Sequence, residues 1–383
     1  MRRRRVIMSG MLIVVGLLVQ AGVSASATTA DETEITLITQ ALIASGVEPG
    51  SEQLESERLA IQQALTETVW RVGTGKPSYR RAYKLQRVLH RNYLKSYDIT
   101  VDNVGRVAQD GTYNCLSGVL FFGLAAERLG FDTRVIEYPG HLLLELDVRG
   151  GPVLIETTSP FGFDVSPSRL LSYGSASSFG RGWLVMPPES SWSVPLSAAV
   201  GFTWLNRAWR TFERGNVAEA VAFVDRAAEH VPDLAERVEA APRLLARAFA
   251  KEYDAGRFDS AYRIATLQAR LDPRPITTQD RVLAAAQKRI EQLCAAGFPA
   301  KAAAIREELD GIHFEPVALA LFDRTVSPAI ISAAVRLDEW GVAEEYVRRH
   351  AASEPDAVER ERLRAWVESR RDEKSPLCSG LRR

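Results

Sequence analysis

The sequence has few of the residues that metal, redox and disulfide sites use. Among its 383 residues are three cysteines and five histidines. The cysteines, Cys115, Cys294 and Cys378, are an odd number at wide spacing, which is not the pattern of a disulfide framework. No pair of cysteines or histidines has the spacing of metal ligands, and no glycine-rich phosphate loop is present. We therefore predict neither a metal nor a cofactor.

The sequence also has no formal net charge, and it has no long apolar stretch after residue 27. Lys and Arg number 48, and Asp and Glu number 48, so nothing in the charge balance indicates nucleic-acid binding. After the first 27 residues we find no apolar stretch that suggests a membrane span, and we predict no membrane association of the mature chain.

The first residues have the pattern of an export signal. "MRRRR" is a basic start, an apolar stretch follows, and Ala25-Ser26-Ala27 has the small residues at which signal peptidase cleaves. We therefore predict that residues 1–27 form a signal peptide and that the mature protein is periplasmic or extracellular. The alternative is an uncleaved segment that anchors the chain in a membrane.

Two parts with different patterns follow the signal. Residues 28–172 begin with helical spacing of apolar residues and continue with short β-rich runs, of which two are separated by "RGG" at 149–151 as in a hairpin. Helices followed by an antiparallel sheet predict an α+β domain. Residues 173–197 are rich in Ser, Gly, Pro and Trp, which is typical of a linker.

The second part repeats itself. Gly215, Gly256 and Gly297 lie 41 residues apart, and Ala220, Ala261 and Ala302 keep the same step. Each copy predicts a helix, a glycine turn and a second, alanine-rich helix. We expect stacked helical hairpins over 198–370, with a concave binding surface, and a charged tail at 371–383. Cys294 occupies a helix-core column of this repeat, so we interpret it as a buried apolar residue.

Cys115 stands where a nucleophile would stand. Asn114 before it is a good N-cap, and the apolar residues after it have helical spacing, so a helix is predicted to begin at Cys115. Unpaired N–H groups and the positive end of the helix dipole favour a thiolate at that point. A structural buried thiol is the alternative.

A thiolate needs a base and a group that orients the base. His141 is the histidine that lies in the strand region of the same domain, and Glu156 is the carboxylate on the next strand. If the hairpin turn is Arg149-Gly150, Glu156 is the diagonal neighbour of His141 on one sheet face. Thr158 and Asp164 are the alternatives to Glu156 as orienting group.

These segments resemble a known family. "YNCLSGVLFFGLAAERLGF", "PGH" and "IETTSPFGF" are similar to the transglutaminase-like superfamily. The resemblance implies a papain-like fold in which Cys115, His141 and Glu156 are catalytic, with Glu where that superfamily usually has Asp. It also implies an oxyanion donor, for which Gln109 is the candidate and Tyr113 the alternative.

The first helical copy, "TWLNRAWRTFERGNVAEAVAFVDRAAEHVP", resembles a tetratricopeptide repeat. A HEAT-type array is the alternative, since the period of 41 exceeds the roughly 34 of that repeat. The expected fold is thus a papain-like, transglutaminase-like α+β domain followed by an all-α, tetratricopeptide-like solenoid.

The expected activity is acyl transfer. Cys115 would attack the carbonyl of a peptide or carboxamide, and water or an amine would resolve the thioester. This makes the protein a peptidase or amidase, or an amine-transferring enzyme with the activity of a transglutaminase. Its partners would be a peptide or protein substrate and a protein bound by the repeats. The alternative is an inactive scaffold or peptide-binding protein.

Overall fold

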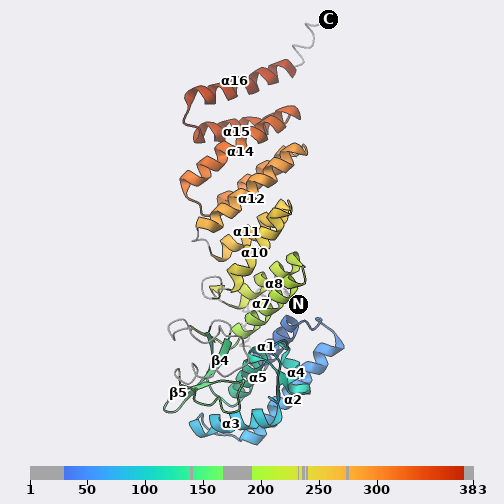
Figure 1. Cartoon of the computed structure of the whole chain (residues 1–383), viewed down its shortest axis with the longest axis vertical. Coiled ribbons are helices and arrows are strands. Elements are labelled where there is room, and N and C mark those ends of the chain that lie inside the picture. Colours follow the sequence, from blue (N-terminus) through green and yellow to red (C-terminus); the bar gives the residue numbers. More distant parts are fainter. Residues whose placement is uncertain are drawn as a thin grey trace, which may run out of the picture.

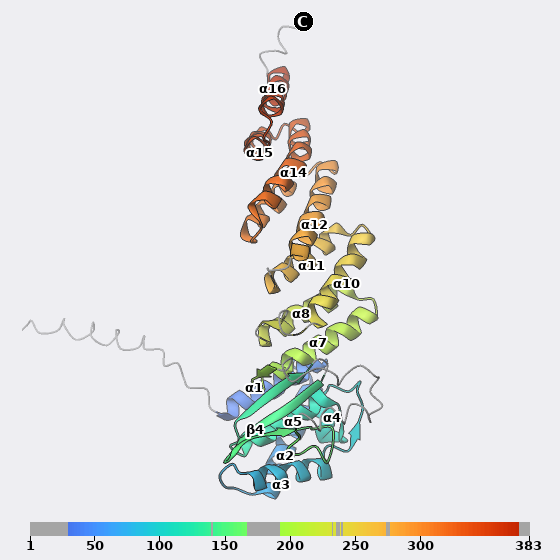
Figure 2. The same cartoon turned by 60° about the vertical axis from the view of Figure 1, so that its left-hand side comes forward.

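The computed structural model describes residues 30–138, 141–166, 192–231, 233–234, 238, 240–272 and 276–374. The predicted signal peptide at 1–27 and Cys378 lie outside these residues. In Figure 1, helices and a small sheet form the lower part, and a column of helices continues from them to the C-terminal end. In Figure 2 the sheet lies at the front of the lower part.

The N-terminal part combines five helices with six short strands among the described residues. The helices are α1 (Ala30–Ser45), α2 (Glu52–Val72), α3 (Tyr79–Asn92), α4 (Val104–Gln109) and α5 (Cys115–Arg128). The strands are β1 (Ser96–Tyr97), β2 (Thr112–Tyr113), β3 (Thr133–Tyr138), β4 (His141–Val148), β5 (Gly151–Ile155) and β6 (Trp192–Val194).

The main sheet is antiparallel, with strand order β5-β4-β3-β6. The hairpin between β4 and β5 turns at Arg149-Gly150, as predicted, and Val148 pairs with Gly151. Strand β6 differs from the prediction, because it belongs to the stretch expected as a linker at 173–197. Trp192 explains this difference: its indole N–H donates to the Glu137 carboxylate on β3 over 2.6 Å, and Val194 is buried.

Helix α5 lies at the centre of this part. Nearly all of its side chains are buried, because the sequence from Leu116 to Ala126 is apolar except for Ser117. It packs against β4 on one side and against α7 on another. Gly123 allows the close approach of the chain before α7, since a Cβ at this position would lie 2.4 Å from a methyl carbon of Leu196.

The C-terminal part is an array of helical hairpins. The helices are α7 (Ala198–Glu213), α8 (Val217–His230), α10 (Ala240–Asp254), α11 (Phe258–Leu271), α12 (Ile276–Ala295), α13 (Pro299–Glu308), the 3-10 helix η2 (Leu309–Gly311), α14 (Pro316–Arg336), α15 (Trp340–Ser353) and α16 (Ala357–Lys374). Successive helices of the array lie side by side in both views (Figures 1 and 2).

The repeat register predicted from the glycines is confirmed. Gly215, Gly256 and Gly297 lie in the turns of three hairpins with φ of 91°, 72° and 82°. In the fourth hairpin Asp338 takes this position with φ of 61°. The alanine column, which continues to Ala343, has no exposed surface. Cys294 is buried, as predicted.

The expected fold class is correct in its coarse features and wrong in its finer assignment. The described residues are mostly helical, with one small sheet and repeat-like packing of helices, and they show no papain-like core. The papain-like assignment was wrong because the pattern of Cys, His and Glu describes only a few residues around one site. The rest of the part is made by helices α1 to α4, which share one apolar core with the first two hairpins from Leu37 to Leu267.

One helix of the described part, α14, is long and apolar enough to cross a membrane by length and composition. The sequence analysis did not anticipate it. It packs between α12 and α15, and Phe322, Ile330 and Ile331 are buried there, as in the core helix of a repeat array.

Candidate active site

Cys115 is the first residue of α5, and its position is set by the residue before it. Asn114 has extended backbone, and its Oδ1 accepts hydrogen bonds from the backbone N–H groups of Leu116 and Ser117, both at 2.9 Å. The Ser117 hydroxyl accepts in return from the Asn114 N–H at 2.9 Å. This capping box confirms the predicted helix start. Cys115 is half-buried, whereas its neighbours in the helix are buried.

His141 begins β4 and Glu156 directly follows β5, in the predicted register. Leu144 pairs with Ile155, so the next position places Leu143 opposite Glu156 and His141 diagonal to it. Strand β5 ends at Ile155, and the Glu156 N–H donates to the Gly162 carbonyl at 2.7 Å. The following loop therefore folds back against Glu156.

The imidazole of His141 lies between the thiol and the carboxylate. Its Nε2 is 2.5 Å from Glu156 Oε2, and the ring also interacts with the Cys115 side chain, an interaction that raises the pKa of His141. Because Glu156 occupies Nε2, Nδ1 is the nitrogen that remains for the thiol. The other carboxylate oxygen, Oε1, accepts from the Thr158 hydroxyl at 2.6 Å and from the Thr158 N–H at 2.8 Å. Cys115, His141 and Glu156 are thus brought together.

The charges of the pair support one another. Burial opposes the positive form of His141, but the Glu156 charge and the hydrogen bonds to Cys115 and Glu156 outweigh it and raise the pKa of His141 to about 10. Burial likewise opposes the Glu156 carboxylate, but His141 and Thr158 hold the pKa of Glu156 below its usual value. At neutral pH His141 is therefore an imidazolium, and a positive ring beside a sulfur atom favours the nucleophilic thiolate.

Tyr97 is a further residue at this site that the sequence analysis did not find. Strand β1 pairs with β2 in parallel, which sets Tyr97 beside Tyr113, and the two rings meet edge to face at 5.7 Å. The Tyr97 hydroxyl accepts a hydrogen bond from the backbone N–H of Cys115, and burial raises the pKa of Tyr97. The only local signal was an aromatic residue in a two-residue strand, which is too short to predict.

The proposed oxyanion residue Gln109 is not brought to this group by any contact. It is exposed at the end of α4 and has no hydrogen-bond partner in the described part of the chain. The alternative, Tyr113, is buried, and its hydroxyl donates to the Thr158 carbonyl at 3.2 Å. Tyr113 therefore supports the loop that holds Glu156.

The alternatives to Glu156 have other roles. Thr158 donates to Glu156, as described above, and Asp164 accepts a hydrogen bond from the Tyr79 hydroxyl at 3.0 Å. His90 lies near Tyr113, with 6.5 Å between the ring centres, and burial lowers the pKa of His90 to about 4. Among the described residues no group of three His, Cys, Asp or Glu side chains could hold a metal ion.

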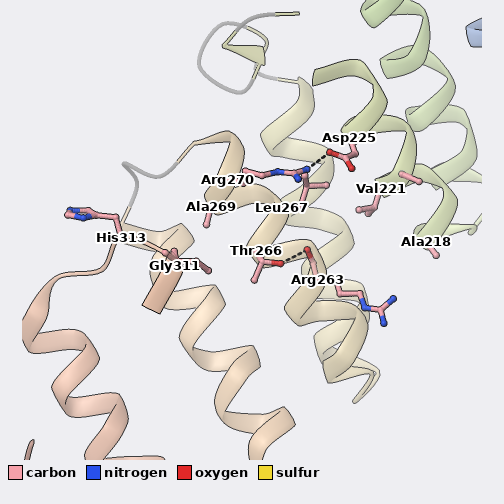
Figure 3. A pocket seen from close by; sticks show the side chains of 12 residues that line it. Ala218, Val221, Asp225, Arg263, Thr266, Leu267, Ala269, Arg270, Gly311 and His313 are labelled. Atoms are coloured by element: carbon pink, nitrogen blue, oxygen red, sulfur yellow. Dashed lines mark hydrogen bonds and ion pairs between the residues drawn. The ribbon is translucent and has the colours of Figure 1, made fainter. Parts of the chain in front are cut away.

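A separate groove lies in the helical array. It has a volume of about 790 Å³ and is lined by α8, α11 and the segment after α13. Figure 3 shows Val221 and Asp225 of α8 opposite Thr266 and Arg270 of α11, with an ion pair between Asp225 and Arg270. His313 is exposed at the same groove. The groove as a whole offers both apolar and charged contacts.

Comparison with known proteins finds little. No protein-family model and no curated protein sequence matches the chain. A solved structure of menin, which reveals that protein's binding site for the Mixed Lineage Leukemia (MLL) protein, is similar with a TM-score of 0.36 and 11% identity. The match covers 92% of this chain and 88% of the menin chain. A likeness this weak supports no conclusion on fold, partner or activity.

The two family assignments made from the sequence are therefore corrected. Membership of the transglutaminase-like superfamily, and the assignment of the array as tetratricopeptide repeats, are wrong: no family model matches, and the described residues are mostly helical, with repeat-like packing and no papain-like core. The physical reason is the short range of the evidence. A cysteine at a helix start, a histidine on a strand and an acid on the next strand are local features that do not determine the surrounding fold.

Proposed function

We propose that this protein is an exported cysteine-dependent acyl-transfer enzyme that acts on a peptide or carboxamide through Cys115, His141 and Glu156. One observation carries the proposal: a single imidazole is hydrogen-bonded to a buried carboxylate and interacts with a thiol at a helix N-terminus. This arrangement of nucleophile, base and orienting group is the one that thiol catalysis requires. The proposal rests on the geometry of these three residues and not on the comparisons with known proteins.

The chemistry follows from the positions of the protons. The Cys115 sulfur attacks the substrate carbonyl, and the His141 imidazolium gives its proton to the leaving amine as the carbon–nitrogen bond breaks. Neutral His141 then removes a proton from water or from an acceptor amine as it attacks the thioester carbonyl; the carbon–sulfur bond breaks, the acyl group is released, and the thiolate and the imidazolium are restored. Glu156, held by Thr158, keeps the ring oriented and stabilises its positive form. The Tyr97 O–H at the start of α5 is the donor for the negative oxygen.

Hydrolysis and amine transfer share these steps, and the acceptor decides between them. A peptide library would detect hydrolysis as new N-termini or released ammonia. A biotinylated primary amine would detect transfer as biotin joined to a protein substrate. Loss of either product in Cys115→Ala is expected, and a product that persists in this variant would assign the activity to another group.

Thiol labelling tests the site without a known substrate. We expect iodoacetamide to modify Cys115 rapidly at neutral pH and His141→Ala to slow this reaction by about tenfold or more, since general-base assistance contributes about 10²–10⁴-fold in enzymes. Cys294→Ala is the matched control, because it removes a buried thiol of the array and leaves the site unchanged. Equal labelling of wild type and His141→Ala would refute the proposal.

A second candidate is a binding protein or scaffold without catalysis. The groove between α8 and α11 favours it, because apolar side chains and an ion pair line the hollow in which an extended peptide could bind. In the enzyme this groove would hold a protein partner or a distant part of the substrate. Arg270→Ala, which breaks the ion pair, should weaken binding of such a peptide while thiol labelling stays unchanged.

Export is proposed from residues 1–27. Protein isolated from the native host should begin at Thr28. A chain that still begins at Met1 in a membrane fraction would favour the uncleaved anchor.

A further inference from the structure

We propose that Arg210 of the helical array is a positioning residue for the nucleophile Cys115. It acts through Asp102 and Asn114, which connect helix α7 to the first turn of α5. This inference rests on the proposed function, because it concerns the geometry of the same thiol. It goes beyond that function by making the array part of the site.

The contact between the two parts is a forked ion pair. Arg210 donates from both terminal nitrogens to the two carboxylate oxygens of Asp102, with 2.8 Å between Nη1 and Oδ1. The same Nη1 donates to the Thr100 carbonyl at 2.7 Å. The Asp102 side chain is 1% exposed, whereas that of Arg210 is 39% exposed. A buried carboxylate is thus held by an arginine that reaches it from the array.

Asp102 connects Arg210 to the residue that precedes α5. Its Oδ1 accepts from the Asn114 amide at 3.3 Å, and the same amide is 3.4 Å from the Ile99 carbonyl. These bonds fix the Asn114 side chain in the orientation in which its Oδ1 caps Leu116 and Ser117. The orientation of one amide therefore depends on the Asp102 carboxylate.

The same loop also holds the residue that faces the Cys115 backbone. Tyr97 precedes Asp98, whose N–H donates to the Tyr113 carbonyl at 2.8 Å, and the Ser117 hydroxyl donates to the Val101 carbonyl at 3.1 Å. Residues 97–102 thus lie along the N-terminus of α5. A shift of this loop would change both the cap and the Tyr97 contact.

Without Arg210 the Asp102 carboxylate would be buried and unpaired. It would turn toward solvent, which removes the acceptor of the Asn114 amide, or take up a proton, which leaves a neutral and weaker acceptor. The first turn of α5 would then loosen, and the sulfur would lose its fixed orientation toward the His141 ring. Displacements of about 1 Å at a reacting atom reduce rates by about 10²-fold, so the effect on thiol reactivity should be large.

The test measures iodoacetamide labelling of Cys115 as a function of pH in a Cys294→Ala, Cys378→Ser background. Arg210→Met should lower the rate at neutral pH by about tenfold, because the sulfur loses its fixed orientation toward the His141 ring. Arg210→Lys keeps the charge and should recover part of the rate. Arg214→Met is the matched control at the end of the same helix, since the Arg214 side chain donates to the Arg210 carbonyl and the Thr211 hydroxyl of α7 and not to Asp102.

A purely structural role would lower the thermal midpoint and leave the labelling rate of the folded protein at neutral pH unchanged, and that result would overturn the inference. If Arg210→Met does not fold, the paired variant Asp102→Asn with Arg210→Met removes both charges and is measured in its place. Slower labelling in His141→Ala with unchanged labelling in the Arg210 variants would refute positioning and leave the function standing. Unchanged labelling in His141→Ala would refute the function itself.

Discussion

Replacing Glu156 by Gln tests the electrostatics of the site most directly. The substitution keeps the shape of the side chain, and the Gln oxygen can still accept the hydrogen bonds from Thr158. It removes the negative charge that faces His141. The pKa of His141 is raised from its usual 6.5 to about 10. Burial acts in the opposite direction, so the carboxylate contributes much of this difference.

We expect the pKa of His141 to fall by about 2 units or more in Glu156→Gln, which corresponds to about 3 kcal/mol. The ring would then be largely neutral above neutral pH, and labelling of Cys115 there should slow. NMR of the His141 ring protons measures the titration directly. Asp147→Asn is the control, because Asp147 is an exposed carboxylate on β4, the strand that begins with His141. A titration midpoint that stays within half a unit of wild type, about 0.7 kcal/mol, would refute the reasoning.

The same variant should change the dependence of stability on pH. Since the pKa of His141 is raised, its contribution is complete below about pH 6.5 and is lost as the pH rises through about 10. Since the pKa of Glu156 is lowered from 4.5, its contribution is complete above about pH 4.5 and is lost at lower pH. The pair therefore stabilises most between these limits. Urea unfolding of wild type should show a decline in stability between pH 7 and pH 10, and Glu156→Gln should lose this decline.

Three further predictions concern the fold. Gly256→Ala should lower the free energy of unfolding by about 1 kcal/mol, because its φ is 72°, whereas Gly311→Ala, also in open space but without a positive φ, should not; urea unfolding compares them. Gly162→Ala should slow Cys115 labelling, since its Cβ would lie 2.1 Å from the Glu156 carbonyl oxygen, and wild-type rates would contradict this. Arg306→Met should cost about 3–5 kcal/mol by leaving Asp323 without its buried partner, and a calorimetric midpoint equal to that of wild type would exclude this.

Local patterns predicted a large share of the site. The start of α5 followed from Asn114, because an N-cap depends on backbone groups two and three residues away. The facing of His141 and Glu156 followed from the turn at Arg149-Gly150, because a hairpin turn sets the register of both strands. The glycine column of the array followed from the period of 41.

The family could not be predicted from such local patterns. The segments that suggested it extend over short parts of the chain, and they say little of how α1 to α4 pack or how many strands the sheet contains. The edge strand β6 was read as linker because its three residues lie beside a stretch of Ser, Gly and Pro. Pairing with β3 and the Trp192 contact with Glu137 decide its structure.

The sequence by itself determined the helix start at Cys115, the hairpin register and the repeat, because each depends on residues close together in the chain. Only the tertiary structure decided that Tyr97 faces the Cys115 backbone and that Arg210 of the array holds Asp102 beneath Asn114. Such contacts join residues far apart in sequence, and they form only when a common apolar core has fixed the helices and loops that carry them.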